Sequence, residues 1–169
     1  MMLITAAAAQ LWIGVPAEAG AGIALTSSGL MVHRGGQEPE LVEWIQIASA
    51  RLEAKVSMWR HPRAASWLMN LVAAVLDSWA PGDPPEVRVL ITRSDGSSIS
   101  TMAPAPYLTR YVRAEVDAVS ELLRRAVREA DVRNLLDDSD RVVAAVQRRV
   151  ETGEPLQLGE AARDTQERG

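Results

Sequence analysis

Short apolar runs alternate with turn-forming residues in the first third of the chain. Residues 23–25 and 30–32 are apolar, and the linker between them ends in Gly29, a residue that can supply the positive φ of a tight reversal. This pattern predicts a β-hairpin. A third strand is expected over residues 41–47, where β-branched and aromatic side chains dominate. Residues 5–15 are expected to form a first strand, with a helical turn as the competing interpretation.

Helical spacing of apolar residues begins in the middle of the chain. Apolar side chains recur at steps of three and four over residues 63–79, which predicts a largely buried helix. The same spacing over residues 107–130 predicts a long amphipathic helix lying against a sheet, and a narrower stripe over residues 139–150 predicts another helix. Between the first two helices, the Asp95–Gly96 pair predicts the turn of a second hairpin.

Composition narrows the class of partner. The chain has 169 residues, 47% of them hydrophobic, and its 22 acidic residues outnumber 18 basic ones, giving a net charge of −4. This balance argues against a nucleic-acid partner and against stable membrane association, since both need clustered cationic side chains. The apolar N-terminus has no basic region and is too short to cross a bilayer, so a cytoplasmic location is expected. Seventeen arginines against one lysine indicate a GC-rich coding sequence, typical of actinobacteria and their phages.

No group of residues in the sequence has the residue types and spacing of a known catalytic site. Cysteine is absent, which excludes thiolate catalysis and zinc ribbons, and the two histidines, His33 and His61, lack the spacing of metal ligands. Neither a nucleophile elbow nor a phosphate-binding glycine loop is present. We therefore expect no catalytic residues, no metal and no cofactor, and a protein that is not an enzyme.

Two segments carry a resemblance to a known family. Thr26-Ser-Ser-Gly-Leu30-Met-Val32, followed by Leu41-Val-Glu-Trp44-Ile45-Gln-Ile47, resembles a line common in bacterial pleckstrin-homology-like (PH-like) domains. The resemblance spans about residues 3–128. It implies an α+β fold in which two antiparallel sheets form a small, partly open barrel that a long C-terminal helix caps. It also implies a scaffold for binding peptides or proteins, although fold alone does not fix function.

The expected domain organisation follows from this resemblance. Residues 1–130 form the PH-like domain, with a helical insertion at about residues 63–79. Residues 131–153 add an accessory helix after the capping helix. Residues 154–169 are polar and charged, and we expect them to be a flexible tail.

The leading functional hypothesis is a non-enzymatic interaction module. It binds a protein partner or self-associates into a homodimer through helix surfaces, with Trp59 and Trp79 as aromatic anchors and with Val142 and Val146 on the last helix.

Two alternatives remain open from the sequence. One is a sensor of a small anionic ligand or lipid head group at the barrel mouth, using His33, Arg34 and Arg93. The other is a secretion-type chaperone, because small acidic α/β proteins with that function have a similar composition.

Overall fold

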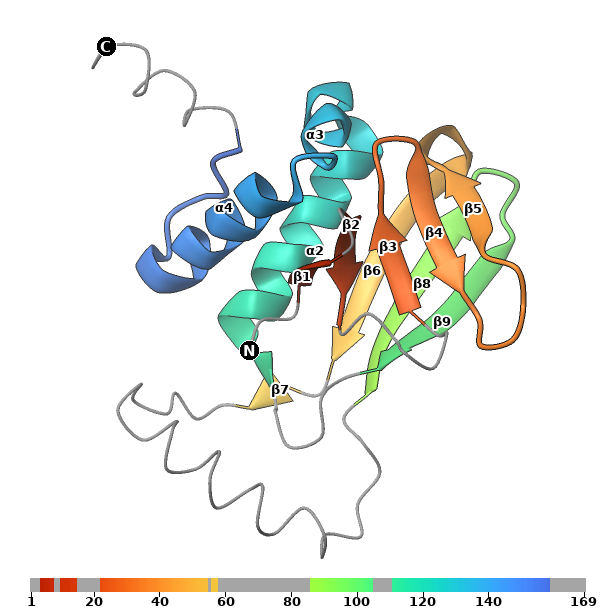
Figure 1. The fold of residues 1–169 in the computed structure, drawn as a ribbon, viewed down its shortest axis with the longest axis horizontal. Coiled ribbons are helices and arrows are strands. Elements are labelled where there is room, and N and C mark those ends of the chain that lie inside the picture. The colour runs from red at the N-terminus through yellow and green to blue at the C-terminus, as the bar shows by residue number, and fades with distance from the viewer. Residues whose placement is uncertain are drawn as a thin grey trace, which may run out of the picture.

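The computed structural model describes residues 4–7, 10–14, 22–54, 56–57, 86–104 and 111–158, and these residues form an α+β structure. The α+β class expected from the sequence is therefore confirmed. Two antiparallel sheets and three helices share one hydrophobic core (Figure 1). The helix expected over residues 63–79 lies outside the described residues, as do Trp59 and Trp79.

A five-stranded antiparallel sheet contains the first strands in chain order. Its members are β1 (Ile4–Ala7), β2 (Gln10–Ile13), β3 (Gly22–Leu25), β4 (Gly29–His33) and β5 (Glu40–Glu43). The β3–β4 pair confirms the first predicted hairpin. The single strand expected over residues 5–15 was wrong, because the chain reverses so that Ala7 pairs with Gln10. This reversal buries Ile4 together with Leu11 and Ile13, which one extended strand would place farther apart.

The strand expected over residues 41–47 is divided between two sheets. Trp44–Gln46 form a 3-10 helix, η1, and the second sheet begins at Ile47. The indole N–H of Trp44 donates to the Thr26 carbonyl at 2.9 Å, which holds the corner against the β3–β4 turn. Ile45 consequently faces solvent and is 80% exposed. A β-rich composition predicted the strands on both sides of this corner but not the corner itself.

The second sheet has three antiparallel strands in the order β6-β8-β9. They are β6 (Ile47–Ala54), β8 (Glu86–Arg93) and β9 (Ser98–Pro104). Shortly after β6, the two-residue strand β7 (Val56–Ser57) pairs in parallel with β10 (Tyr111–Val112). The β8–β9 pair confirms the second predicted hairpin.

The β8–β9 turn is held by Asp95. Its carboxylate accepts hydrogen bonds from the hydroxyl of Ser97 at 2.6 Å and from the amide of Ser97 at 2.8 Å, and Gly96 supplies a φ of 84°. These bonds favour the ionised carboxylate and hold the pKa of Asp95 below its ordinary value. The turn thus combines a glycine in the left-handed region with a side-chain acceptor.

Carboxyl-carbon NMR titration should give Asp95 a lower pKa in the folded protein than in the unfolded chain, and Ser97→Ala should raise it again. Because the folded pKa is depressed, the stabilising contribution is present above the unfolded pKa and is lost as pH falls through the folded pKa. An unchanged pKa in the Ser97→Ala protein would contradict this origin of the shift.

Three helices follow the sheets: α2 (Arg113–Arg128), α3 (Ala130–Leu135) and α4 (Ser139–Thr152). The long predicted helix starts later than residue 107, because residues 111–112 belong to β10. Its buried side chains join the core of both sheets. The helix α4 confirms the prediction over residues 139–150, with Asp138 capping its first turn and Gly153 ending it at a φ of 76°.

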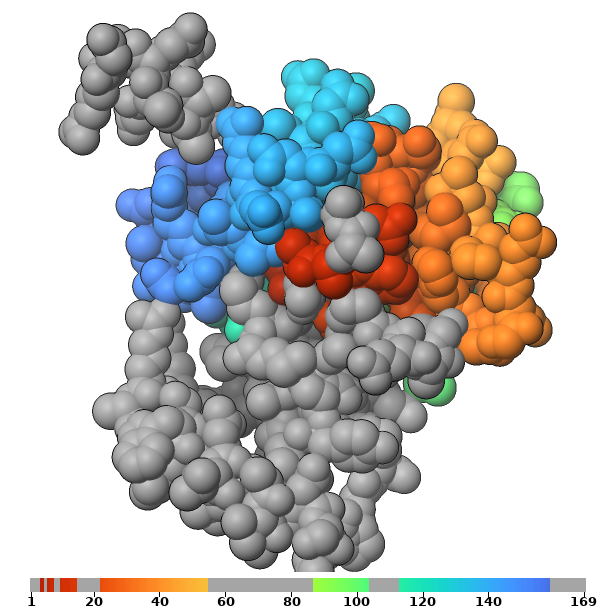
Figure 2. Space-filling model, viewed as in Figure 1, coloured from red at the N-terminus to blue at the C-terminus, as the bar shows by residue number. Residues whose placement is uncertain are grey.

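The last two helices, α3 and α4, pack on α2 (Figure 1). Figure 2 shows their surface next to that of the first strands. Val142 and Val146 are buried in the core, at 0% and 1% exposure, and so are Leu156 and Leu158, at 3% each. These two leucines, at alternate positions in the first part of the predicted tail, supply apolar side chains that pack on the core. Residues 159–169 lie outside the described part.

Candidate functional site

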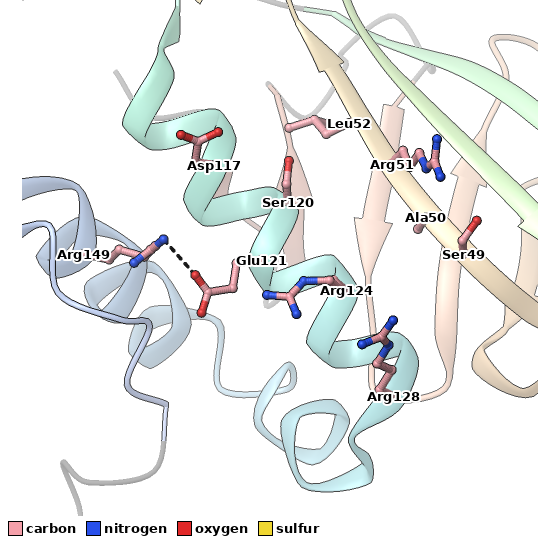
Figure 3. A pocket seen from close by; sticks show the side chains of 10 residues that line it. All are labelled: Ser49, Ala50, Arg51, Leu52, Asp117, Ser120, Glu121, Arg124, Arg128 and Arg149. Carbon is pink, nitrogen blue, oxygen red and sulfur yellow. Dashed lines mark ion pairs between the residues drawn. The ribbon is translucent and has the colours of Figure 1, made fainter.

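A groove of about 570 Å³ runs between β6 and α2 (Figure 3). One wall is the middle of β6 and the other is the side of α2 that faces it. The lining residues are Ser49, Ala50, Arg51, Leu52, Asp117, Ser120, Glu121, Arg124, Arg128 and Arg149. Four consecutive residues of β6 contribute, although successive side chains of a strand point to opposite faces. The groove therefore faces the edge of this strand.

The edge of β6 next to the groove is open. Within the described residues, β6 pairs with β8 on one side only, and the short β7–β10 pair follows beyond its end. Backbone N–H and C=O groups of alternate residues in β6 therefore point away from β8, and no strand among the described residues pairs with them. Such an edge can accept the backbone of another extended segment.

The strand β5, at one end of the five-stranded sheet, is less suited to pairing than β6. It has four residues, and its two glutamates, Glu40 and Glu43, flank a buried Val42. Short length and charge are both features that discourage edge pairing. β6 has eight residues, so it offers the longer template.

Polar and charged side chains cover the α2 wall. Residues 117, 120, 121, 124 and 128 recur at three- and four-residue steps, so they share one side of the helix. The carboxylate of Glu121 forms an ion pair with Arg149 of α4 at 2.9 Å, with side chains only 19% and 23% exposed. This half-buried pair joins the last helix to the groove (Figure 3).

Three arginines at the groove have no carboxylate partner in the described part of the chain. Arg51 projects from β6, and Arg124 and Arg128 project from successive turns of α2. All three are exposed, whereas most other described arginines of the helices form ion pairs or hydrogen bonds. The groove therefore has unneutralised positive charge on both walls.

The candidate ligand site of His33, Arg34 and Arg93 is only partly assembled. Arg34 and Arg93 meet at Glu40: one carboxylate oxygen lies 2.9 Å from the Arg34 guanidinium and the other contacts Arg93. Glu40 thus already supplies the anion that these two groups would bind. The His33 ring instead packs against the Trp12 ring in a tilted arrangement, with 4.9 Å between ring centroids and 44° between the ring planes.

Arg93 also borders a second hollow of about 520 Å³. Its other lining residues are Ile45, Gln46, Ser94 and Asp95. Among the residues described, no cluster of three His, Asp or Glu side chains is arranged to hold a metal ion.

Of the four predicted partner-contact residues, the structure describes two. Trp59 and Trp79 lie outside the described residues. Val142 and Val146 belong to the core, so the expectation that they form a partner surface is corrected: their apolar stripe packs on the chain itself.

The groove was not foreseen from the sequence. Arg124 and Arg128 lie on the polar side of an amphipathic helix, where the sequence alone does not distinguish a binding surface from a solvated one. The edge of β6 cannot be predicted from a pattern that does not reveal strand partners. The four-residue spacing of Arg124 and Arg128 was the one available signal.

Comparisons with known proteins provide no relative from which the fold or the role of the groove could be inferred. No protein-family model, no curated protein and no solved structure matches the chain. None of the described helices combines the length and apolar composition needed to cross a membrane.

Proposed function

We propose that this protein is a non-enzymatic interaction module that binds an extended segment of a partner protein as an added strand on β6. The observation that carries the proposal is the open edge of β6, eight residues long, with α2 forming a wall beside it. In this mode of recognition, main-chain hydrogen bonds supply affinity, and pockets for alternate side chains supply specificity. The arginines of the groove would act on those alternate side chains.

The PH-like fold is part of the same proposal. Its support is the arrangement of a five-stranded sheet, a three-stranded sheet and a long helix around one core. In such an arrangement the first strand of the second sheet lies at an edge, with the closing helix next to it.

The geometry gives less support to the other two functions. An anionic ligand at Arg34 and Arg93 would have to compete with Glu40. A chaperone for a hydrophobic client needs an apolar surface, whereas charged and small polar side chains dominate the groove.

Alternate N-methylation of a bound peptide tests the added strand. Eight-residue peptides, matching the length of β6, are selected for binding from a displayed random library. Methylating one set of alternate amides should weaken binding at least tenfold, about 1.4 kcal/mol, because those N–H groups face β6. Methylating the other set should have a smaller effect, since those amides face away from the strand.

The site is located by NMR in the same experiment. Amide shifts on peptide addition should occur in β6 and α2, with β9, the other edge strand of this sheet, as the internal control. Equal binding by both methylated sets, or shifts confined to β9, would contradict the proposal.

A further inference from the structure

We infer that the segment bound in the groove carries an acid-x-acid sequence toward its C-terminal end and runs antiparallel to β6. This inference rests on the proposed function and names the chemistry of the partner. It follows from the distribution of charge along the groove, the relative direction of its walls and the spacing of two arginines.

The charge of the groove is divided along its length. Four arginines and two carboxylates line it, and one arginine, Arg149, is neutralised by Glu121. Asp117 lies in the first half of α2 and Glu121 at its middle, whereas Arg124 and Arg128 lie nearer its C-terminal end. Asp117 has an exposed partner in Arg113 at 3.9 Å, so the unpaired positive charge of the α2 wall lies at Arg124 and Arg128. A segment with acidic residues at one end places its negative charge beside these two arginines.

The two walls run in opposite directions. β10 pairs with β7 beyond the end of β6, and α2 begins at the next residue, Arg113. The helix then contacts β6 and η1, which precedes β6. The arginine end of α2 therefore lies beside the start of β6, and Asp117 lies nearer its end. A segment antiparallel to β6 runs in the same direction as α2, so its C-terminal part faces Arg124 and Arg128.

The spacing of the arginines matches that of a strand. Arg124 and Arg128 are four residues apart on α2, a rise of about 6 Å. Residues i and i+2 of an extended segment point to the same side and are separated by about 6.7 Å. Two acidic side chains with one residue between them can therefore each reach a guanidinium group, forming charge-assisted hydrogen bonds. Antiparallel pairing is also the slightly more stable geometry per residue.

Two fluorescein-labelled peptides of equal composition test the inference. TVRVEVET places its glutamates toward the C-terminus, and TEVEVRVT is the same sequence reversed. We expect the first peptide to bind at least tenfold more tightly by fluorescence anisotropy, with the neutral peptide TVQVQVQT in between. Equal affinity for the two charged peptides would overturn the inference while leaving the proposed function intact, provided that all three bind. Absence of binding by all three would count against both.

Charge reversal in the protein provides the matched control. The double variant Arg124→Glu/Arg128→Glu should lose at least tenfold affinity for TVRVEVET and should gain affinity for TVEVRVRT, in which the charges are exchanged. The variant Arg88→Glu/Arg148→Glu has the same net charge but changes two exposed arginines outside the groove, and it should bind as the unaltered protein does. Equal losses in the two variants would show a nonspecific effect of net charge and overturn the inference.

Other occupants of the groove give different outcomes. Tighter binding of a single-stranded oligonucleotide or of phosphatidylglycerol vesicles than of TVRVEVET, abolished by Arg124→Glu/Arg128→Glu, would replace the acidic segment with a phosphate ligand. A dimer in light scattering that the same substitutions dissociate would identify a second copy as the occupant. Either result would overturn the inference.

Discussion

Replacing Trp44 with alanine is expected to lower the free energy of unfolding by about 3–5 kcal/mol, the range for removing a large buried aromatic side chain. Trp44 is 3% exposed and lies in the core at the corner between the two sheets. Its indole N–H donates to Thr26 at 2.9 Å, and its backbone amide donates to Ser28 at 3.2 Å. The alanine variant therefore loses both packing and the side-chain hydrogen bond that positions the β3–β4 turn.

Urea denaturation followed by circular dichroism measures this effect. Trp44→Phe is the matched control, because it keeps a buried aromatic ring and removes the indole donor. Its cost should be about 1–3 kcal/mol, the range for leaving one polar partner unsatisfied. If Trp44→Ala and Trp44→Phe cost the same small amount, the indole would not hold the corner. A change in the slope of the unfolding free energy against urea concentration would show that the denatured state is affected as well.

Replacing Gly29 with alanine should cost about 3 kcal/mol, at the upper end of the usual range for overpacking. A Cβ atom at this position would lie 2.2 Å from the carbonyl oxygen of Val42 and 2.9 Å from the Cα of Glu43. Both atoms belong to the backbone of β5, so relief requires β4 and β5 to move apart. This movement would disturb pairing in the five-stranded sheet.

Gly36→Ala and Gly96→Ala are the controls for Gly29. Both glycines have a positive φ, 75° and 84°, and a Cβ atom at either would have nothing within 4 Å. Their cost should be about 1–2 kcal/mol, which reflects the left-handed backbone alone. Thermal or urea unfolding of the three variants distinguishes the two reasons for a glycine, which are a positive φ and the close approach of a neighbouring strand. A Gly29→Ala protein as stable as the controls would disprove the close approach of the two strands.

Turn chemistry predicted the hairpins well, but for Gly29 it did so with the wrong reason. The sequence suggested a positive φ at Gly29, whereas the described glycines with positive φ are Gly14, Gly36, Gly96 and Gly153. Gly29 is required because β5 passes too close for a side chain. The local sequence shows only that a glycine is present. The contact that excludes a side chain at this position is made by β5, which comes later in the chain.

The sequence pattern did not predict where some of the expected elements are interrupted or where an extra one begins. Residues 41–47 form a β-rich run, and nothing in that run shows that Trp44 turns the chain into another sheet. In the C-terminal part of the chain the apolar stripes predicted helices over residues 107–130 and 139–150, yet a further helix, α3, occupies Ala130–Leu135. Val132 and the C-cap residue Leu136 are buried, so tertiary packing stabilises a helix that is too short to be stable alone.

The candidate site depends on features that a single sequence does not display. An open strand edge is defined by the strand that is missing beside it, and no local pattern records that. The arginines illustrate the same point: Arg125 and Arg128 are three residues apart, yet Arg125 pairs with Glu129 and donates to the Leu156 carbonyl at 2.7 Å, whereas Arg128 faces the groove. Only the packing around α2 distinguishes them.

The position of α2 between two packed layers bears on the entropy of binding. The helix contacts β6 on one side and α3 and α4 on others, and Arg133 donates to the carbonyls of Ala126 and Val127 at its end. Neither wall of the groove can shift without disturbing the core. The backbone freedom lost on association is therefore lost mainly by the partner, whereas the protein loses side-chain freedom at the exposed Arg124 and Arg128. A partner segment that is already extended in solution would lose the least backbone freedom.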